Sequence, residues 1–451
     1  MFAEGKAPET YEIQVMIDTM FIAVCTSMVF LMQAGFALLE VGSVQMKNAK
    51  SILIKNLLDG SVGSIAWWSF GYGIAFGGSG DDNPNGIIGT SGFFLNGSSG
   101  ELTREWNAYI VWAFQWAFAT TSATIVSGCV AERMNPSSYL IFSGFITGFF
   151  YPVIVHWVWN EHGWLSQMGF FDFAGCAPVH MVGGISGFIG AYMLGPRTGR
   201  FDLDGKANPM PAHNMVLSTL GCLILWFGWY GFNCGSVQSL ANGGALVVGK
   251  VFICTTLAAA SGGLVTYGIE TYITGIKDLP PLINGVLAGL VSITSCADSV
   301  DTWASIIIGG IGALIYSGGS RAVIANQIDD PLHAFALHGL CGFWGVIAVG
   351  IFCEPDSGHA GLLYGNYQQL GYQFLGAWVT VVWSILTSYI CFYLIDICVG
   401  IRVTLNDEKV GMDEAHHGGS AYPDFVKKKG APIQDVVIVM TDVETPRDLW
   451  K

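Results

Sequence analysis

Charged side chains are scarce in this sequence. Asp, Glu, Lys and Arg make up 12% of its 451 residues, whereas an ordinary soluble domain contains about 25%. Hydrophobic residues account for 52%, and they gather into runs of about twenty, the length that spans the hydrocarbon core of a bilayer. The scarcity of charge argues against a water-soluble fold and predicts an integral membrane protein.

Other missing features exclude classes of function. The 11 cysteines are scattered through apolar segments without paired spacing, which argues against a disulfide framework and a zinc site. No basic cluster is large enough for nucleic acid, and the formal net charge of -14 suits a cationic substrate better. No nucleophile, metal cluster or phosphate-binding loop lies near the apolar runs. We therefore expect no enzyme activity, no cofactor and no metal.

The apolar runs predict an all-α membrane protein with eleven transmembrane helices. The first twelve residues lack the basic leader of a signal peptide, so we expect the first apolar run to remain as a helix. The predicted spans are residues 13–40, 52–77, 108–131, 137–158, 175–195, 212–233, 245–274, 280–297, 303–319, 334–352 and 371–401.

Lys and Arg are distributed unequally between alternate loops, and this bias sets the orientation. One side has Lys6 and Arg104, whereas the other has Lys47, Lys50, Arg133, Arg197, Arg200, Lys206, Lys277 and Arg321. We expect the N-terminus outside and the C-terminus in the cytoplasm. The predicted parts are an external N-terminus (1–12), a spanning domain (13–402) and a cytoplasmic regulatory tail (403–451).

The longest external loop, residues 78–106, is rich in Gly, Asn and Asp. It contains Asn96-Gly97-Ser98, which fits the pattern for N-glycosylation. The charged tail at the other end is too short and too polar to bury a core of its own. We expect the tail to serve regulation or assembly.

Two pairs of segments are similar at matching places in the two halves of the chain. Residues 33–43 at the end of the first span resemble 229–236 at the end of the sixth, and 179–184 in the fifth resemble 337–342 in the tenth. Because each half contains an odd number of spans, the halves run oppositely across the membrane. This predicts an inverted repeat plus a long eleventh helix, with a site near the midplane.

His180 and His338 lie at matching positions of this repeat, inside apolar spans. An imidazole in lipid costs free energy unless it faces a cavity or a partner, and two facing imidazoles can hold a proton between them. A proton relay is one interpretation. Bonding of each ring to a nearby carbonyl is another, and haem ligation a third, although the flanking glycines favour close helix contact. These are Gly183, Gly184, Gly187, Gly339, Gly342 and Gly345.

Aromatic and acidic residues supply further candidates. Most of the aromatic side chains are expected to face lipid or pack, but a subset could bind a small cation, at roughly 0.5–2 kcal/mol per ring. Asp172 precedes the fifth span, where a carboxylate can cap the helix and support a cation site. Asp59 and Lys55 are one helical turn apart, which predicts an intrahelical ion pair outside the site. The aromatic candidates are Trp112, Phe114, Trp116, Phe118, Trp157, Trp159, Trp229 and Phe232.

Four motifs carry a family resemblance. Asp172 begins a stretch that runs to Gly184, and the others are residues 195–201, 226–236 and 329–339. Together they resemble the ammonium transporter family, which includes methylammonium permeases and Rhesus proteins, and most closely its plant-type branch. The likeness covers nearly all eleven predicted spans. It implies a multi-pass homotrimer of the plasma membrane with one pore through each subunit.

The resemblance also implies roles for matching residues. Ammonium or methylammonium would be recruited outside by Trp159 and Ser236, with Phe114 or Phe118 nearby. Below, Phe118 and Phe232 would stack as the gate. Ammonia would then pass His180 and His338, which relay the proton, and be reprotonated inside. Supporting positions are Asp172 and Trp229.

The implied mechanism has a rival of another class. An ammonium sensor would use the same external site but signal through the tail, or through a cytoplasmic regulator bound to it, with little flux. The intact histidine pair favours transport, and the tail lacks the length of a fused signalling domain.

Three positions depart from the family pattern. His333 stands where plant-type relatives have an acidic residue, and Pro178 is unusual and could distort the start of the fifth span. Ala415 replaces the threonine that is phosphorylated in the plant-type tail, so that switch cannot operate here. The alternative phosphorylation sites are Thr404, Ser420 and Thr441, and nothing in the sequence selects among them.

Overall fold

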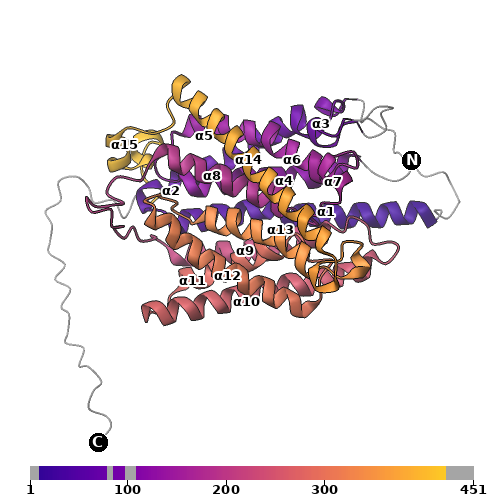
Figure 1. Ribbon diagram of the computed structural model, residues 1–451. Coiled ribbons are helices and arrows are strands. Elements are labelled where there is room, and N and C mark those ends of the chain that lie inside the picture. Colours follow the sequence, from indigo (N-terminus) through magenta and orange to yellow (C-terminus); the bar gives the residue numbers. More distant parts are fainter. Residues whose placement is uncertain (1–9, 79–84, 97–107, 423–451) are drawn as a thin grey trace, which may run out of the picture.

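The computed structural model describes residues 10–78, 85–96 and 108–422, and all regular elements in these ranges are helices (Figure 1). Eight of the helices are long and apolar enough to cross a membrane, and α11 (Leu279–Ile293) is a shorter apolar helix. An all-helical membrane fold is therefore confirmed. The number of crossings stays a prediction.

The first half of the chain places a helical segment in each of its predicted spans. Several of these segments join an α-helix to a π-helical turn. The label η marks a short turn of either π or 3-10 helix. In order they are α1 (Thr10–Ser43), η1 (Met46–Asn48), α2 (Ala49–Ala66), η2 (Trp67–Gly71), α3 (Tyr72–Phe76), η3 (Phe93–Leu95), α4 (Ala108–Val130), α5 (Pro136–Phe145), η4 (Ile146–Phe150), α6 (Tyr151–Trp159), α7 (Trp164–Met168), η5 (Cys176–Met181) and α8 (Val182–Leu194), of which η1 and η3 are 3-10 turns.

The second half continues the same pattern and ends in two short helices of the tail. The elements are α9 (Met215–Gly235), α10 (Gly244–Thr274), α11, α12 (Thr302–Ala325), η6 (Phe335–Leu340), α13 (Cys341–Phe352), η7 (Pro355–Ser357), η8 (Leu362–Tyr364), α14 (Tyr367–Cys398), α15 (Leu405–Val410) and α16 (Met412–His416). Here η6 is a π turn, and η7 and η8 are 3-10 turns.

Helix α11 ends at Ile293, four residues before the predicted end of its span. The backbone that follows turns toward the segment before η5, where the carbonyls of Thr294 and Ser295 accept hydrogen bonds from Ala174 (3.2 Å) and Phe173 (2.9 Å). The helix stops early because these carbonyls are used across the interface between the two halves.

Glycines bring α1 and α9 into close antiparallel contact. A Cβ atom added at Gly42 would lie 2.4 Å from the Oγ of Ser218, and one added at Gly231 would lie 2.5 Å from the Cβ of Met28. Contacts this short exclude a side chain at either glycine. The high glycine content of the sequence thus serves the tight helix packing that membrane proteins use.

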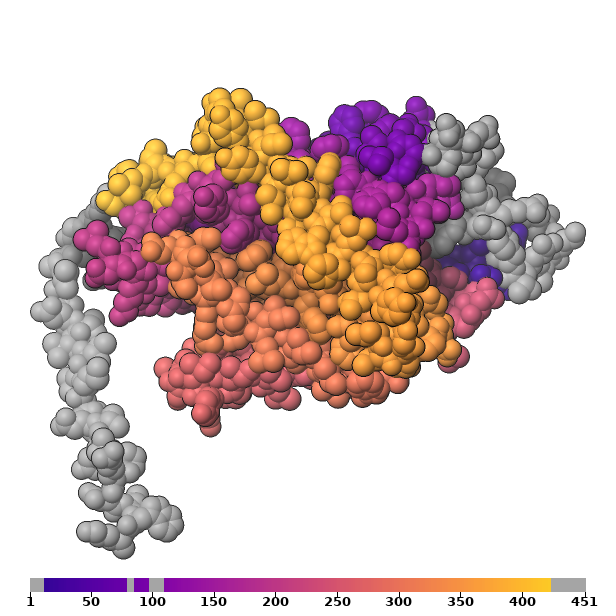
Figure 2. Space-filling view, in the orientation of Figure 1, coloured from indigo at the N-terminus to yellow at the C-terminus, as the bar shows by residue number. Residues whose placement is uncertain are grey.

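Large apolar side chains cover the outside of the bundle. Helix α14 crosses the visible face in Figures 1 and 2, and a side that faced water would carry polar residues instead. We interpret this surface as lipid-facing. Its exposed residues on α14 are Phe374, Leu375, Trp378, Val382, Ile385, Leu386, Tyr389, Ile390, Tyr393, Leu394 and Ile397.

The tail helices dock at the end of the bundle opposite the start of α1 (Figure 1). Asp413 of α16 accepts hydrogen bonds from the backbone N–H groups of Lys50 (2.9 Å) and Ser51 (2.8 Å) in the first turn of α2. The Nζ of Lys47 donates to the carbonyl of Glu408 at 2.6 Å. The tail thereby satisfies orphan donors at the start of a spanning helix.

The predicted ion pair between Lys55 and Asp59 is wrong. Lys55 pairs with Glu40 of α1 at 3.7 Å, and Asp59 accepts hydrogen bonds from Thr124 of α4 and Ser143 of α5. Helix packing has replaced the local pair with partners on neighbouring helices, which sequence spacing cannot reveal. Of the other predicted sites, Gly97 and Ser98 of the glycosylation motif and Thr441 lie outside the described residues.

Candidate functional site

The two π turns η5 and η6 carry the two histidines, and an aspartate caps each turn. Asp172 accepts hydrogen bonds from the N–H groups of Gly175 (2.8 Å), Cys176 (3.1 Å) and Ala177 (2.7 Å) at the start of η5. Asp330 does the same at η6, for Ala334 at 3.1 Å and Phe335 at 2.8 Å. Each carboxylate lies eight residues before its histidine. The structure therefore shows Asp172 as the helix cap that its position predicted.

Asp330 is the residue that sequence reasoning missed. Its spacing to His338 repeats the spacing of Asp172 to His180, and this repeated interval was the signal that would have found it. If the two halves of the sequence are aligned on their histidines, both aspartates are predicted to be helix caps. If each carboxylate is considered separately, only Asp172 is predicted to be a cap.

The imidazoles of His180 and His338 contact each other directly. Their Nδ1 atoms are 3.2 Å apart, so that one Nδ1–H donates to the other Nδ1, and the side chains are buried, with 0% and 4% exposed. Glycine allows this approach, because a Cβ atom at Gly184 would lie 2.3 Å from the backbone nitrogen of Gly339. The direct contact leaves no room for a haem between the rings, and neither ring bonds a carbonyl.

His180 sits within an aromatic stack. Its ring lies 5.3 Å from Trp229 and 5.6 Å from Phe232, centroid to centroid, with interplanar angles of 13° and 24°. The indole of Trp229 is held by a hydrogen bond from Nε1 to the Oγ1 of Thr294, at 3.0 Å. The Nε2 of His180 is buried and has no hydrogen-bond partner in the protein. A buried polar atom without a partner calls for a ligand or water.

Next to this stack, two phenylalanine rings lie face to face. Phe118 of α4 and Phe232 of α9 are stacked with centroids 3.9 Å apart at 23°, and both side chains are 0% exposed. Phe114 contacts Phe118 at 4.7 Å, and Trp159 meets it edge-on at 6.0 Å. The rings form a continuous series from Trp159 through the stacked pair to the histidines.

The predicted external residues lie at the far end of this series. The Nε1 of Trp159 donates to the carbonyl of Asp172 at 2.7 Å, which ties the indole to the cap of η5. The hydroxyl of Ser236 donates to the carbonyl of Phe232 at 2.9 Å. Ser236 follows Gly235, where an added Cβ would lie 2.6 Å from the ring of Phe114. The structure thus gathers Trp159, Phe114, Phe118 and Ser236 around one ring cluster.

Two of the departures from the family pattern can be located. Pro178 lies inside η5, but Ala336 holds the equivalent place in η6, which is also a π turn. The proline is therefore not needed for the π-helical geometry. His333 has φ of 56° and stacks edge-on with Tyr316 at 6.2 Å. Both of these residues line a cavity of about 330 Å³ near the cytoplasmic end of α12.

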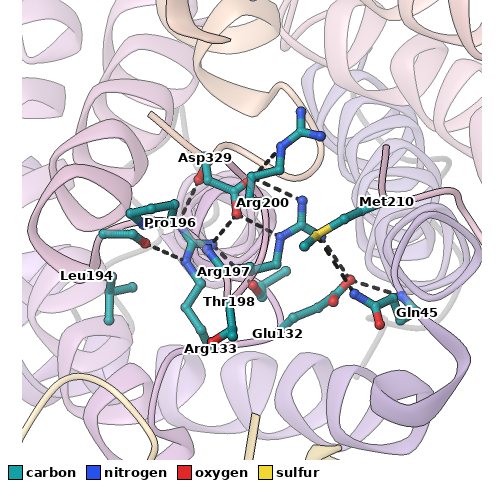
Figure 3. Close-up of polar contacts among 12 residues, drawn as sticks. Gln45, Glu132, Arg133, Leu194, Pro196, Arg197, Thr198, Arg200, Met210 and Asp329 are labelled. Carbon is teal, nitrogen blue, oxygen red and sulfur yellow. Dashed lines mark hydrogen bonds and ion pairs between the residues drawn. The ribbon is translucent and has the colours of Figure 1, made fainter. Parts of the chain in front are cut away.

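A network of charges joins loops from the two halves of the chain (Figure 3). Arg197 donates to both carboxylate oxygens of Asp329, from Nε at 2.7 Å and from Nη2 at 3.0 Å, and pairs with Glu132 at 3.1 Å. Arg200 approaches Asp329 at 3.4 Å, and the Nη2 of Arg133 donates to its carbonyl at 2.6 Å. Burial raises the pKa of Asp329, but the hydrogen bonds and charge of Arg197 outweigh it and lower the pKa to about 2.

The tail is connected to this network. Glu408 accepts a hydrogen bond from the N–H of Thr198 at 2.5 Å and pairs with Arg402 at 2.8 Å. Burial raises the pKa of Glu408, but the hydrogen bond and charge of Arg402 and the hydrogen bonds from Thr198 together lower it by more, so that its pKa lies below the ordinary value. Thr404 accepts from Asp407 as the cap of α15, and Ser420 accepts from Tyr422. Ala415 lies exposed in α16.

The sequence of this chain is similar to a known protein family over most of its length. The family model described as Ammonium Transporter Family matches residues 20–422. The chain is 37% identical over 422 residues to Ammonium transporter 3 of Dictyostelium discoideum, covering 91% of this chain and 95% of the relative. It is 39% identical over 436 residues to Ammonium transporter 1 member 3 of Solanum lycopersicum, covering 90% and 93%.

Solved structures show the same fold. The structure titled Sensor Amt Protein superimposes with a TM-score of 0.84 at 34% identity, covering 90% of this chain and 99% of that one. Mep2 of Candida albicans gives 0.81 at 28% identity, with 94% of each chain covered. From the family match and these relatives together, the chain belongs to the ammonium transporter family.

Proposed function

We propose that this protein transports ammonium across the plasma membrane. The observation that carries the proposal is the contact between His180 and His338, with their Nδ1 atoms 3.2 Å apart, beside the stacked rings of Phe118 and Phe232. A shared hydrogen bond between two neutral imidazoles lets a proton enter one ring and leave from the other. A pair of this kind suits a path that carries ammonia and a proton separately.

Recruitment is assigned to the outer ring cluster. Ring faces attract a cation, and Trp159 and Phe118 meet beside Phe114 and Ser236. Ammonium bound there would lose its proton before passing Phe118 and Phe232, because the stacked rings are uncharged and buried. Potassium has no proton to lose and would be rejected. Asp172 supports the site by capping η5 and accepting from Ser295 at 2.9 Å.

The finer architecture belongs to the same proposal. We infer eleven crossings in residues 13–402, arranged as an inverted repeat with the N-terminus (1–12) outside and a regulatory tail (403–451) in the cytoplasm. The opposite placement of α15 and the start of α1 supports an odd number of crossings (Figure 1), and the matching caps of η5 and η6 support the repeat. We expect a homotrimer, which light scattering of the purified protein would test.

Currents in proteoliposomes test the function. Ammonium and methylammonium should each evoke a current or uptake, and potassium at the same concentration should not. Trp159→Ala should weaken the response to low ammonium concentrations most, because it removes the recruiting ring. Trp378→Ala on the lipid-facing side of α14 is the matched control and should transport normally. Absence of any ammonium-dependent current or uptake would overturn the proposal.

A sensor is the second candidate function. It is favoured by the likeness to the structure titled Sensor Amt Protein and by the docking of α15 and α16 on the cytoplasmic loops. A sensor would bind ammonium at the same rings and change the docking of its tail without flux. Protease protection of the tail, measured with and without ammonium in protein that shows no transport, would identify it.

A further inference from the structure

A buried polar cluster lies among α1, α2, α4 and α5, outside the series of rings described above. It contains Glu40 of α1 with Lys55 and Asp59 of α2. Each carboxylate is 1% exposed, and the lysine side chain is 11% exposed. Two carboxylates and one ammonium group leave one negative charge unbalanced. Charge at membrane depth is costly and is normally paired or neutralised.

Glu40 and Lys55 balance each other. The Oε2 of Glu40 lies 3.7 Å from the lysine Nζ and accepts hydrogen bonds from Ser127 at 2.6 Å and Asn56 at 3.3 Å. The lysine also donates to the carbonyl of Ser127 at 3.2 Å and lies over the ring of Tyr139, 5.0 Å from its centroid. The surplus charge is therefore that of Asp59.

Asp59 has hydroxyl partners and forms no ion pair with a described residue. Ser143 contacts its Oδ1, and the Oγ1 of Thr124 lies 2.8 Å from its Oδ2. That same hydroxyl lies 2.8 Å from the Oε1 of Gln33 and 3.0 Å from the carbonyl of Thr120. One hydroxyl hydrogen cannot be donated to three acceptors. A proton on Oδ2 removes one of these acceptors, because Asp59 then donates to Thr124, and the Thr124 hydroxyl donates to Gln33 or to the carbonyl of Thr120.

Turning over the amide of Gln33 would remove one of the three acceptors. It would supply no positive charge, so the imbalance of the cluster would stay. The charge count therefore carries the assignment of a proton to Asp59, and the shortage of donors at Thr124 agrees with it.

The cluster has a route to the cytoplasmic side. A cavity of about 20 Å³ touches Lys55 and extends to Asn48 at the start of α2 and to Met412 of the tail. A cavity needs about 10–15 Å³ to hold one water molecule. A single water there connects the lysine, one helical turn from Asp59, to the cytoplasmic end of the bundle.

We propose that Asp59 is a proton-binding site separate from the pore, which exchanges its proton with water on the cytoplasmic side. The ionisable groups that face it are Glu40 from α1, Lys55 on its own helix and Tyr139 from α5, with Arg133 beyond the end of α4. Helix α4 itself presents hydroxyls. A proton fits better than a metal ion, because hydrogen bonds already occupy both oxygens of Asp59 and no open ligand set remains.

Infrared difference spectroscopy of the purified protein tests the site without reference to transport. At neutral pH the wild type should show the C=O stretch of a protonated carboxylic acid, and Asp59→Asn should lose that band. Glu40→Gln and the exposed loop variant Asp202→Asn should keep it. Loss of the band in Glu40→Gln in place of Asp59→Asn would overturn the assignment, as would the absence of any acid band in the wild type.

Thermal melting supplies the second measurement. Asparagine mimics the protonated acid, so Asp59→Asn should fold and melt near the wild-type temperature at neutral pH. At alkaline pH the wild type loses its proton and its melting temperature should fall further than that of Asp59→Asn. Equal shifts in the two proteins would contradict the proposal. An inactive wild type would refute transport but leave both measurements intact.

Discussion

His180 and His338 differ in what surrounds their rings. The ring of His180 lies against both Trp229 and Phe232 and has a buried Nε2 without a partner, whereas the ring of His338 lies 6.2 Å from Phe36 in a tilted arrangement. The two ends of the pair are therefore not equivalent. His180 faces the ring of Phe232. In the proposed mechanism, its Nε2 is the atom that receives ammonia or a proton arriving past the stacked rings.

Replacing His180 by alanine should reduce ammonium current by at least about tenfold, because a positioned proton-transfer group contributes roughly 10²–10⁴ to the steps it serves. The pH dependence of the remaining current should change as well. Electrophysiology on proteoliposomes measures both. Unchanged currents with an unchanged pH profile would show that the pair does not handle protons.

The lowered pKa of Asp329 predicts how the stability of the protein changes at acid pH. Its pKa of about 2 lies below the ordinary value of about 3.9, so its ion pair with Arg197 contributes fully above about pH 4. That contribution should be lost as the pH falls toward about 2. Asp329→Asn should be destabilised by about 3–5 kcal/mol at neutral pH, because Arg197 keeps a buried charge. Melting curves should show less acid sensitivity in the variant, and equal sensitivity would refute this assignment.

At the scale of elements, the site depends on two π turns pressed together. Both η5 and η6 follow a capping aspartate and carry a histidine near their ends, and glycine removes the side chains that would separate them. The sequence predicted these spans, the histidines and one of the caps. It did not predict the π geometry or the cap by Asp330, because periodicity distinguishes helix from strand but not α from π.

Gly184→Ala should separate the two turns. Its new Cβ would lie 2.3 Å from the nitrogen of Gly339, and overpacking of this kind costs about 1–3 kcal/mol. We expect transport to fall with the contact between the histidines. Gly318→Ala in α12 is the control, since nothing lies within 4 Å of its added Cβ. Equal effects of the two substitutions on flux would disprove the packing argument.

Two substitutions at Asp172 can distinguish the effect of its hydrogen bonds from the effect of its negative charge. Asp172→Asn keeps an acceptor for η5 but not the charge, and Asp172→Ala removes both at about 0.5–2 kcal/mol for a lost cap. If positioning of η5 is its main task, the asparagine variant should retain most of the ammonium uptake and the alanine variant little. Equal loss in both would assign the role to the negative charge.

At the scale of the whole molecule, the tail docks on the residues around the start of α2 and on the segment after α8, at the end of the bundle opposite the start of α1 (Figure 1). Asp413 caps α2, while Glu408 reaches Thr198 and Arg402 next to the network around Asp329. Helix α2 carries Asp59, and its partner Thr124 shares α4 with the gate residue Phe118. The tail, the proposed proton site and the gate are thus joined through two helices.

Asp413→Ala should release the tail. It removes two acceptors from the first turn of α2, so that residues 403–422 should become sensitive to limited proteolysis while the helical bundle stays intact. Glu414→Ala, which changes an exposed neighbour, should remain protected. Mass spectrometry of the fragments gives the result, and identical digestion of both variants would contradict the docking described here.

The sequence by itself determined that the chain is helical and lies in a membrane, because scarce charge and apolar runs of about twenty residues leave no other stable arrangement. It also selected the histidines, since imidazole is costly in lipid. The tertiary structure decided the partners. Lys55 pairs with Glu40 and not with Asp59, and Asp330 caps η6. These contacts depend on how the glycine-lined surfaces of different helices pack, and the spacing of residues along one helix does not contain that information.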